Sequence, residues 1–301
     1  MRQWIKAGAL GLALLLPGAA DAAGDDQPSS AQVAVERRIN EALDRGEFKT
    51  AAELVEPFAR GGDPKAQALL GVLYLNGRGV PQDFARAFEL FRSAADQGEV
   101  NSQLEVGKLY LAGAGVSKSE VKAASYFLKA SQQGAAEAQF ELGKLFDPGY
   151  FEGDTPKITI LRHSEPTDSN LLEKDAAKAA HFYQLAADKG VKSAQYNLGN
   201  FYANGIGVPQ NFSEAAKFYK MAAVQGVTMA MINLGHLYNK GLGVKQNRIR
   251  AYAWSLLGAV TNDPQALINK DVLASELTRT QRAEAEHLAK LCVDSEYRNC
   301  D

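Results

Sequence analysis

The chain has few of the residues that build metal sites, with only two cysteines and four histidines among its 301 residues. The histidines, His163, His181, His236 and His287, fall in different predicted elements, and neither cysteine lies near one of them in sequence. Protein metal sites bring such ligands together at short, regular spacings. We therefore expect no metal site and no cofactor.

The chain also lacks a large excess of either charge, because 33 Lys and Arg residues nearly balance 35 Asp and Glu residues, for a net charge of −2. The sequence has no basic tail and no basic stripe. Proteins that grip nucleic acid concentrate Lys and Arg on one face. Nucleic acid is therefore excluded from the expected partners.

Long hydrophobic runs are missing apart from Ala7–Leu16, which is too short to span a bilayer. Arg2 and Lys6 precede this run, and small residues follow it. The order is typical of a secretory signal peptide that is cleaved after Ala22 or, alternatively, after Ala20. No cysteine stands at the cleavage site to carry a lipid. We expect an exported protein, periplasmic or secreted, without a transmembrane segment.

The two cysteines, Cys292 and Cys300, are eight residues apart near the end of a predicted helix. Export places them in an oxidising compartment, where disulfides persist. We predict a Cys292–Cys300 disulfide that closes the C-terminus, the alternative being two unpaired thiols.

A glycine recurs along the chain at intervals of 36, 36, 56 and 36 residues. A fixed period of this size indicates a solenoid, whose units bury their apolar faces against their neighbours. The longer interval indicates an insertion of 56 − 36 = 20 residues in the third copy. The five glycines are Gly71, Gly107, Gly143, Gly199 and Gly235.

Two helices per copy are predicted around this glycine. Helix A carries a small residue five positions before it, an apolar residue one before and an aromatic residue three after, which share one helical face. Helix A ends at a second glycine suited to a left-handed cap, namely Gly77, Gly113, Gly149, Gly205 or Gly241. In four copies a further glycine and a valine form a tight turn.

Helix B then begins after an N-cap residue, Asp83, Ser119, Asp175, Asn211 or Asn247. Four residues later stands an unbroken alanine column: Ala87, Ala123, Ala179, Ala215 and Ala251.

This order resembles the Sel-one-like repeat family, a relative of tetratricopeptide repeats, over about residues 62–260. The resemblance implies an all-α fold, a right-handed α-solenoid of helix-turn-helix repeats. The chain departs from the pattern at Pro148 and Tyr150 in the third copy and at Ser255 in the fifth.

We divide the chain into a signal peptide (1–22), N-terminal capping helices (23–62), five repeats (63–260) and C-terminal capping helices (261–301). The capping helices are expected near 34–43, 48–59, 267–277 and 281–291. The insertion, at about 150–173, contains a short β-prone run, Lys157–Arg162. Insertions in solenoids map to loops on one face. A functional loop and a passive surface loop are equally compatible with the sequence.

One catalytic motif is present, the Ser-x-x-Lys of penicillin-recognising enzymes, at Ser119 and Lys122. Ser119 occupies the N-cap column, Lys122 occupies a column that is basic in most other copies, and no companion motif accompanies the pair. The repeat therefore explains the match. We expect no enzymatic activity, although an envelope enzyme or β-lactam-binding repeat protein stays open as an alternative, as does a secreted effector that engages a host protein.

Helix A varies most between copies two positions before, one after and five after the first glycine, which is a single helical face. This face resembles the ligand groove of tetratricopeptide-like arrays, although any solvated face would also be polar and variable. We expect an exported scaffold or adaptor that binds a protein or peptide partner in the cell envelope. The candidate contact residues are Asn76, Glu105, Lys108, Glu141, Lys144, Asn197, Asn200, Asn204, Asn233 and His236.

Overall fold

The computed structural model describes residues 30–149, 172–297 and 300, and within these ranges the chain is helical and contains no strand. The predicted signal peptide and most of the insertion, including Lys157–Arg162, lie outside the described residues. Within each compact unit, nearly every helix packs against the next one in sequence. The described part is thus an all-α repeat solenoid, as the resemblance implied.

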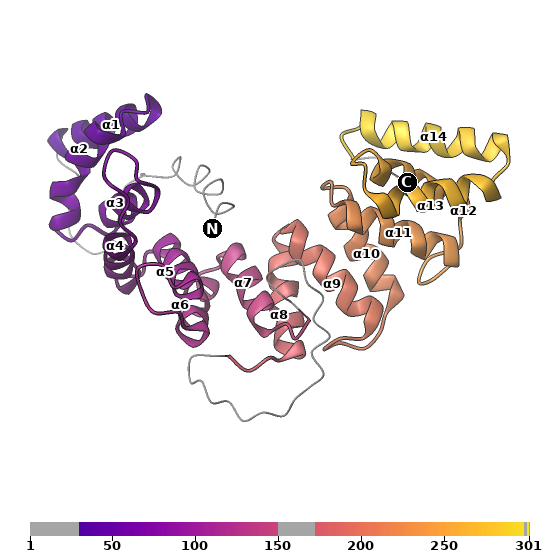
Figure 1. The fold of residues 1–301 in the computed structure, drawn as a ribbon, viewed down its shortest axis with the longest axis horizontal. Coiled ribbons are helices and arrows are strands. Elements are labelled where there is room, and N and C mark those ends of the chain that lie inside the picture. The colour runs from indigo at the N-terminus through magenta and orange to yellow at the C-terminus, as the bar shows by residue number, and fades with distance from the viewer. Residues whose placement is uncertain (1–29, 150–171, 298–299, 301) are drawn as a thin grey trace. The chain divides into compact units, whose positions relative to one another are not determined.

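The first compact unit holds the N-terminal helices, drawn from indigo to magenta in Figure 1. Helix α2 packs on α3, so that the first two helices cover one end of the repeats. The helices are α1 (Ser30–Asp44), α2 (Phe48–Arg60), α3 (Pro64–Asn76), α4 (Phe84–Asp96), α5 (Val100–Ala112) and α6 (Glu120–Gln132).

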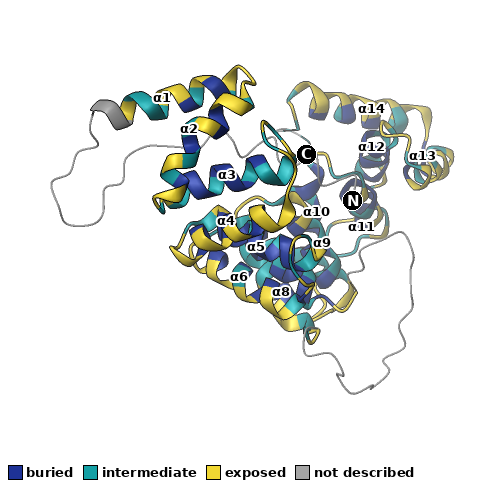
Figure 2. Ribbon diagram, turned by 60° about the vertical axis from the view of Figure 1, so that its left-hand side comes forward, coloured by how far each residue is buried: buried dark blue, intermediate teal, exposed yellow. Residues whose placement is uncertain are grey.

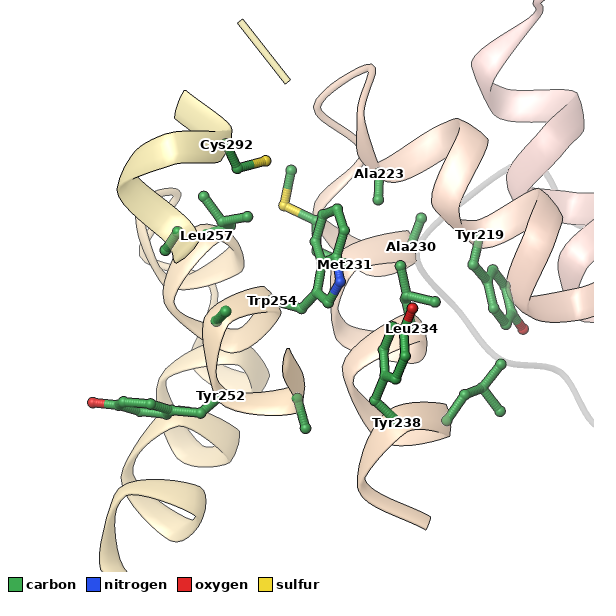
Figure 3. Packing of buried hydrophobic residues seen from close by; sticks show 14 of the residues in the cluster. Tyr219, Ala223, Ala230, Met231, Leu234, Tyr238, Tyr252, Trp254, Leu257 and Cys292 are labelled. Atoms are coloured by element: carbon green, nitrogen blue, oxygen red, sulfur yellow. The ribbon is translucent and has the colours of Figure 1, made fainter. Parts of the chain in front are cut away.

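The second unit holds the remaining repeats and the C-terminal helices, of which α13 and α14 both pack on α12. Trp254 of α12 lies beside Met231 of α11 in the core of this unit (Figure 3). The helices are α7 (Ala136–Phe146), α8 (Ala176–Asp188), α9 (Lys192–Asn204), α10 (Phe212–Ala223), α11 (Thr228–Lys240), α12 (Arg248–Ala259), α13 (Pro264–Glu276) and α14 (Arg279–Asp294).

Each B helix starts at the predicted N-cap, whose side-chain oxygen accepts a hydrogen bond from a backbone N–H of the first turn. The backbone N–H of the same residue donates to the carbonyl of the aromatic residue near the end of helix A, as from Asp83 to Tyr74 at 3.0 Å. This bond closes the A-B turn in all five repeats, the third included, where Asp175 donates to Phe146 at 2.8 Å.

The interior of each repeat combines small and aromatic side chains. All five residues of the alanine column have no exposed surface. In the first four copies the repeat glycine of helix A faces an aromatic ring of helix B, namely Phe91, Phe127, Tyr183 or Tyr219. Helix B keeps one exposed face, visible as the yellow stripe on α4 in Figure 2, whereas helix A is mostly buried or half-buried.

A ladder of glutamines, not predicted from the sequence, joins consecutive repeats. The buried Gln103 donates from Nε2 to the carbonyl of Ala95, which lies in the preceding B helix, at 3.3 Å. Its own oxygen accepts from Nε2 of Gln133 at 3.0 Å. Gln67 and Gln195 make equivalent bonds in the first and fourth copies. Met231 takes this position in the fifth copy, so the ladder is not continued there.

The third copy departs from the prediction at the end of helix A. Helix α7 ends at Phe146, and Gly149, which we expected as a left-handed cap, is not among the residues with positive φ. The reason is Pro148, which has no N–H to donate and disfavours helical geometry in the residue before it. Instead, Asp147 accepts from the backbone N–H of Gly149 at 2.8 Å.

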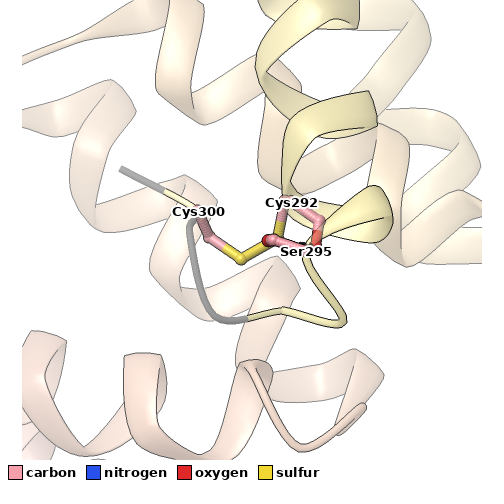
Figure 4. The surroundings of a disulfide bond; sticks show 3 residues. All are labelled: Cys292, Ser295 and Cys300. Carbon is pink, nitrogen blue, oxygen red and sulfur yellow. Dashed lines mark hydrogen bonds between the residues drawn. A yellow bond between two sulfur atoms is a disulfide. The ribbon is translucent and has the colours of Figure 1, made fainter.

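The C-terminal end is closed by the predicted disulfide between Cys292 and Cys300 (Figure 4). Cys292 is buried against the core of the second unit, and Ser295 donates from Oγ to its carbonyl at 3.0 Å. Thr278 is the N-cap of α14 and forms a capping box with Gln281. Helices α13 and α14 both begin earlier than the sequence pattern indicated.

Candidate functional site

The ten candidate residues all lie on A helices or at their ends. Asn76, Glu105 and Lys108 belong to the first unit and the other seven to the second. Eight of them are half-buried, while Asn204 and His236 are exposed. This set is the variable face of helix A, and its members can be compared within each unit.

The acidic and basic members of the variable face form ion pairs within their own helices. Lys108 Nζ lies 2.8 Å from Glu105 Oε1, and Lys144 Nζ lies 2.7 Å from Glu141 Oε2. Each pair is three residues apart, the spacing at which helical side chains meet. Because each charge is largely compensated by its partner, these residues do not make the face strongly acidic or basic.

Two of the asparagines bond to the backbone of their own helix. Nδ2 of Asn76 donates to the carbonyl of Val72 at 2.9 Å, and Nδ2 of Asn204 donates to the carbonyl of Asn200 at 2.8 Å. Each bond runs to a carbonyl one turn earlier in the same helix, near the C-terminus of that helix. The helical spacing predicted the place of these residues on the variable face but not this local role.

Asn200 and Asn233 meet across the fourth and fifth repeats and share a third residue, Tyr219 of α10. The Tyr219 hydroxyl donates to Asn200 Oδ1 at 2.7 Å, and Asn233 Nδ2 donates to the same oxygen at 3.3 Å. We call these three residues the amide network. The Tyr219 ring is buried in the core, where Figure 3 shows it with its hydroxyl at the outer end.

Burial raises the pKa of Tyr219 to about 12, an effect that a hydrogen bond with Asn233 partly opposes and that nearby Tyr196 reinforces. The phenol is therefore protonated, and able to donate, throughout the neutral pH range. Tyr219 is not among the predicted site residues, because its position in the repeat is that of an aromatic core residue. The available signal was its hydroxyl, which is absent from Phe91 and Phe127 in the same column.

A comparable pair in the third copy was also missed. Asp147 is 6% exposed, and its Oδ2 accepts from the Tyr183 hydroxyl at 3.0 Å. On the other side of the turn, Lys174 Nζ donates to the carbonyl of Leu145 at 2.8 Å. These contacts hold both described ends of the insertion close to α7.

The Ser-x-x-Lys motif has a structural role. Ser119 is 3% exposed and its Oγ accepts from the backbone N–H of Lys122 at 3.3 Å, as an N-cap. Lys122 Nζ lies over the Tyr110 ring, 5.5 Å from its centroid, and Lys178 and Arg250 cover the equivalent rings of their copies. Both residues thus do what their columns do in other repeats.

Within residues 30–149, 172–297 and 300, no group of three or more His, Cys, Asp or Glu side chains could hold a metal ion. The described helices also include none with the length and apolar character needed to cross a membrane. A small cavity of about 10 Å³ lies beside the disulfide and is lined by Trp254, Leu257 and Cys300 among others. It has room for about one water molecule.

Comparison with known proteins agrees with the repeat pattern. A family model described as Sel1 repeat matches residues 64–99, 100–134, 136–157, 168–191, 192–227 and 228–259. The third copy is thus matched in two parts, which leave residues 158–167 of the insertion unmatched. A search of curated proteins finds no match.

Two solved structures are similar over most of this chain. A Sel1 repeat protein from Oxalobacter formigenes has a TM-score of 0.65 at 27% identity, with 76% of this chain and 86% of that chain covered. A protective antigen of uropathogenic Escherichia coli strains that displays an SLR fold has a TM-score of 0.50 at 26% identity. That match covers 89% of this chain and 64% of the antigen's chain.

Proposed function

Because the chain belongs to the Sel1 repeat family, whose repeats generally mediate protein–protein interactions, we propose that it is an exported scaffold that binds a protein or peptide. The variable face of helix A is the binding surface in this proposal. In this proposal the partner of the protein is a component of the cell envelope. A segment of that partner lies along consecutive A helices.

The observation that carries this proposal is the amide network. Asn200 and Asn233 are half-buried polar residues on successive A helices, and their side chains bond to each other. Amides can both donate and accept hydrogen bonds, which suits them to a polypeptide partner. The ion-paired charges on the neighbouring part of the face leave it without a strong field for nucleic acid or a phosphorylated ligand.

The Cys292–Cys300 disulfide supports the exported location, because structural disulfides persist in oxidising compartments. We expect the protein in the periplasmic fraction of the producing cells, with residues 1–22 removed. Fractionation and the mass of the purified N-terminal peptide test both points. Protein in the cytosolic fraction with residue 1 retained would contradict export, and protein in the medium would favour a secreted effector.

We expect the combined variant Asn197→Ala, Asn200→Ala and Asn233→Ala to lose the native partner. The measurement is in-compartment crosslinking followed by mass spectrometry, with thermal unfolding measured in parallel because the change leaves the Tyr219 hydroxyl without its acceptor. Removing a partner from a buried polar group costs about 1–3 kcal/mol.

A matched control changes His181, Gln184 and Asp188 to Ala on α8, where His181 and Asp188 are exposed and Gln184 is half-buried. Surface changes of this kind usually alter stability by about 0.5 kcal/mol or less. We expect the control to retain the partners of the wild-type chain. If both triple variants give identical partner lists, the variable face is not the binding surface.

A further variant tests whether the insertion takes part in binding. We expect that residues 149–174 can be replaced by the six-residue turn 77–82 of the first copy without loss of folding, because the bond from Asp175 to Phe146 matches the bond from Asp83 to Tyr74. The circular dichroism spectrum and melting temperature should stay close to those of the wild type. A large loss of helix would show that the insertion is part of the fold, and a selective loss of partners would assign it to the binding surface.

A further inference from the structure

The amide network restricts how Asn200 can bind anything else. Its Oδ1 accepts two hydrogen bonds, one from the Tyr219 hydroxyl at 2.7 Å and one from Asn233 Nδ2 at 3.3 Å. A carbonyl oxygen has two lone pairs, so this oxygen is saturated. The side chain of Asn200 is therefore held in one amide orientation and has only its N–H groups to offer.

Asn233 is left with the opposite capacity. Its Nδ2 is engaged with Asn200, so its Oδ1 is the atom that can accept a further hydrogen bond. Donor and acceptor thus come from adjacent repeats. One peptide unit has the complementary pair, a carbonyl that accepts and an N–H that donates.

The hydroxyl of Tyr219 is not needed for packing. Phe91 and Phe127 occupy the same column in the first two copies and are equally buried with no hydroxyl. In these two copies the residue after the repeat glycine is Val72 or Lys108. Neither has a side-chain amide that a tyrosine hydroxyl could hold in place. Tyrosine and asparagine therefore occur together in the fourth copy alone, which indicates a local task and not a requirement of the repeat.

We propose that Asn200 and Asn233 bind the main chain of an extended peptide segment, with Asn200 donating to a carbonyl and Asn233 accepting from an N–H. This proposal rests on the scaffold function and identifies the chemical group that the variable face recognises. Tyr219 is a positioning residue, because it acts through Asn200. A neutral peptide group is favoured over a carboxylate because the residues of the network are uncharged.

The test uses the mature full chain, labelled with ¹⁵N, and a capped tetra-alanine peptide at millimolar concentration. We expect saturable shifts of the side-chain amide signals of Asn200 and Asn233. The same peptide with methylated backbone nitrogens should bind at least tenfold more weakly, because it cannot donate to Asn233. Sodium acetate is the third probe, and acetate binding in preference to the capped peptide would overturn the assignment to main chain.

Asn200→Asp is the decisive variant. It is the same size and keeps an oxygen for Tyr219 and Asn233, but it replaces the N–H donors by a second acceptor. We expect capped-peptide affinity to fall at least tenfold with little change in the melting temperature. Unchanged affinity would refute the proposal.

Tyr219→Phe separates positioning from simple packing. It keeps the ring and removes the hydroxyl, so the Asn200 amide should reorient more freely, which ¹⁵N relaxation of its side chain would detect before any peptide is added. Tyr196→Phe is the control, since its ring lies 6.2 Å from that of Tyr219 and its hydroxyl is outside the network. Equal amide mobility in the two variants would remove Tyr219 from the site.

The outcomes keep the two proposals distinct. If Asn200→Asp has no effect on capped-peptide binding while the triple alanine variant still loses the native partner, the scaffold function stands and the main-chain site fails. If the triple variant keeps its partners, the scaffold assignment of this face fails first.

Discussion

Gly115→Ala is expected to destabilise the first unit by roughly 4 kcal/mol or more, a loss that few single substitutions reach. Gly115 has φ of +71°, and a Cβ placed on it would lie 2.2 Å from the carbonyl oxygen of Phe84. Phe84 is the first residue of α4, so the turn of one repeat rests on the start of helix B in the repeat before it. Both sides of the contact are backbone, and neither can move without shifting a helix.

Gly113→Ala is the matched control for this prediction. Gly113 stands two residues earlier with φ of +65°, but a Cβ placed on it would have the Cβ of Lys118 as its nearest neighbour, at 3.4 Å, an ordinary contact. An alanine there bears only the penalty of left-handed geometry, about 1–2 kcal/mol. Urea unfolding of the two variants, followed by circular dichroism, measures the difference. Equal losses in both would show that the inter-repeat contact is not tight.

The same contact recurs wherever the Gly-x-Gly turn is present. In each case the second glycine of the turn lies against the backbone of a residue at the start of an earlier helix, and an added Cβ would lie within 2.4 Å of that backbone. The pairs are Gly79 with Phe48, Gly207 with Ala176 and Gly243 with Phe212. The sequence pattern predicted a tight turn at these sites. It did not predict the contact, because the partner lies about 30 residues away and its position depends on how repeats stack.

The period, the N-caps and the alanine column could be predicted because each depends on residues within one helix pair. The sequence pattern did not indicate which group lies against the repeat glycine, which is an aromatic ring of helix B in the first four copies and the carbonyl oxygen of Ala251 in the fifth. The glutamine ladder was missed because Gln67, Gln103 and Gln195 resemble ordinary polar helix residues in sequence. Their burial follows only from the stacking of one repeat on the next.

The candidate site shows the same limit. Helical spacing was sufficient to place Asn200 and Asn233 on one face, since both occur at fixed offsets from the repeat glycine. It could not show that Tyr219 reaches that face from the core, nor that Asn76 and Asn204 bond to their own helices. Hydrogen bonds between side chains depend on rotamers, and an offset within a repeat does not determine a rotamer.

Gly107→Ala is expected to cost about 3 kcal/mol, near the upper end for an overfilled core. A Cβ on Gly107 would lie 2.4 Å from Cε1 of Phe127, whose side chain has no exposed surface and no room to turn aside. Alanine favours the helix by about 1 kcal/mol relative to glycine. The expected loss in the free energy of unfolding already includes this favourable contribution.

The fifth copy supplies the comparison. Ser255 stands where the other copies have an aromatic ring. The atoms nearest to a Cβ on Gly235 would be the carbonyl oxygen of Ala251 at 3.2 Å and side-chain atoms of Ser255 and Trp254 at 3.6 Å. We expect Gly235→Ala to change stability by about 1 kcal/mol or less, because the helix preference of alanine offsets the close contact.

A double-mutant cycle identifies the ring as the cause. Phe127→Leu alone removes buried aromatic contacts and is destabilising, but in the Gly107→Ala background it also relieves the overlap. The double variant should therefore lose less stability than the sum of the two single losses, with a coupling of about 1 kcal/mol or more between the sites. Strict additivity would mean that Phe127 does not confine position 107, and the glycine would then have to be explained by the approach of another element.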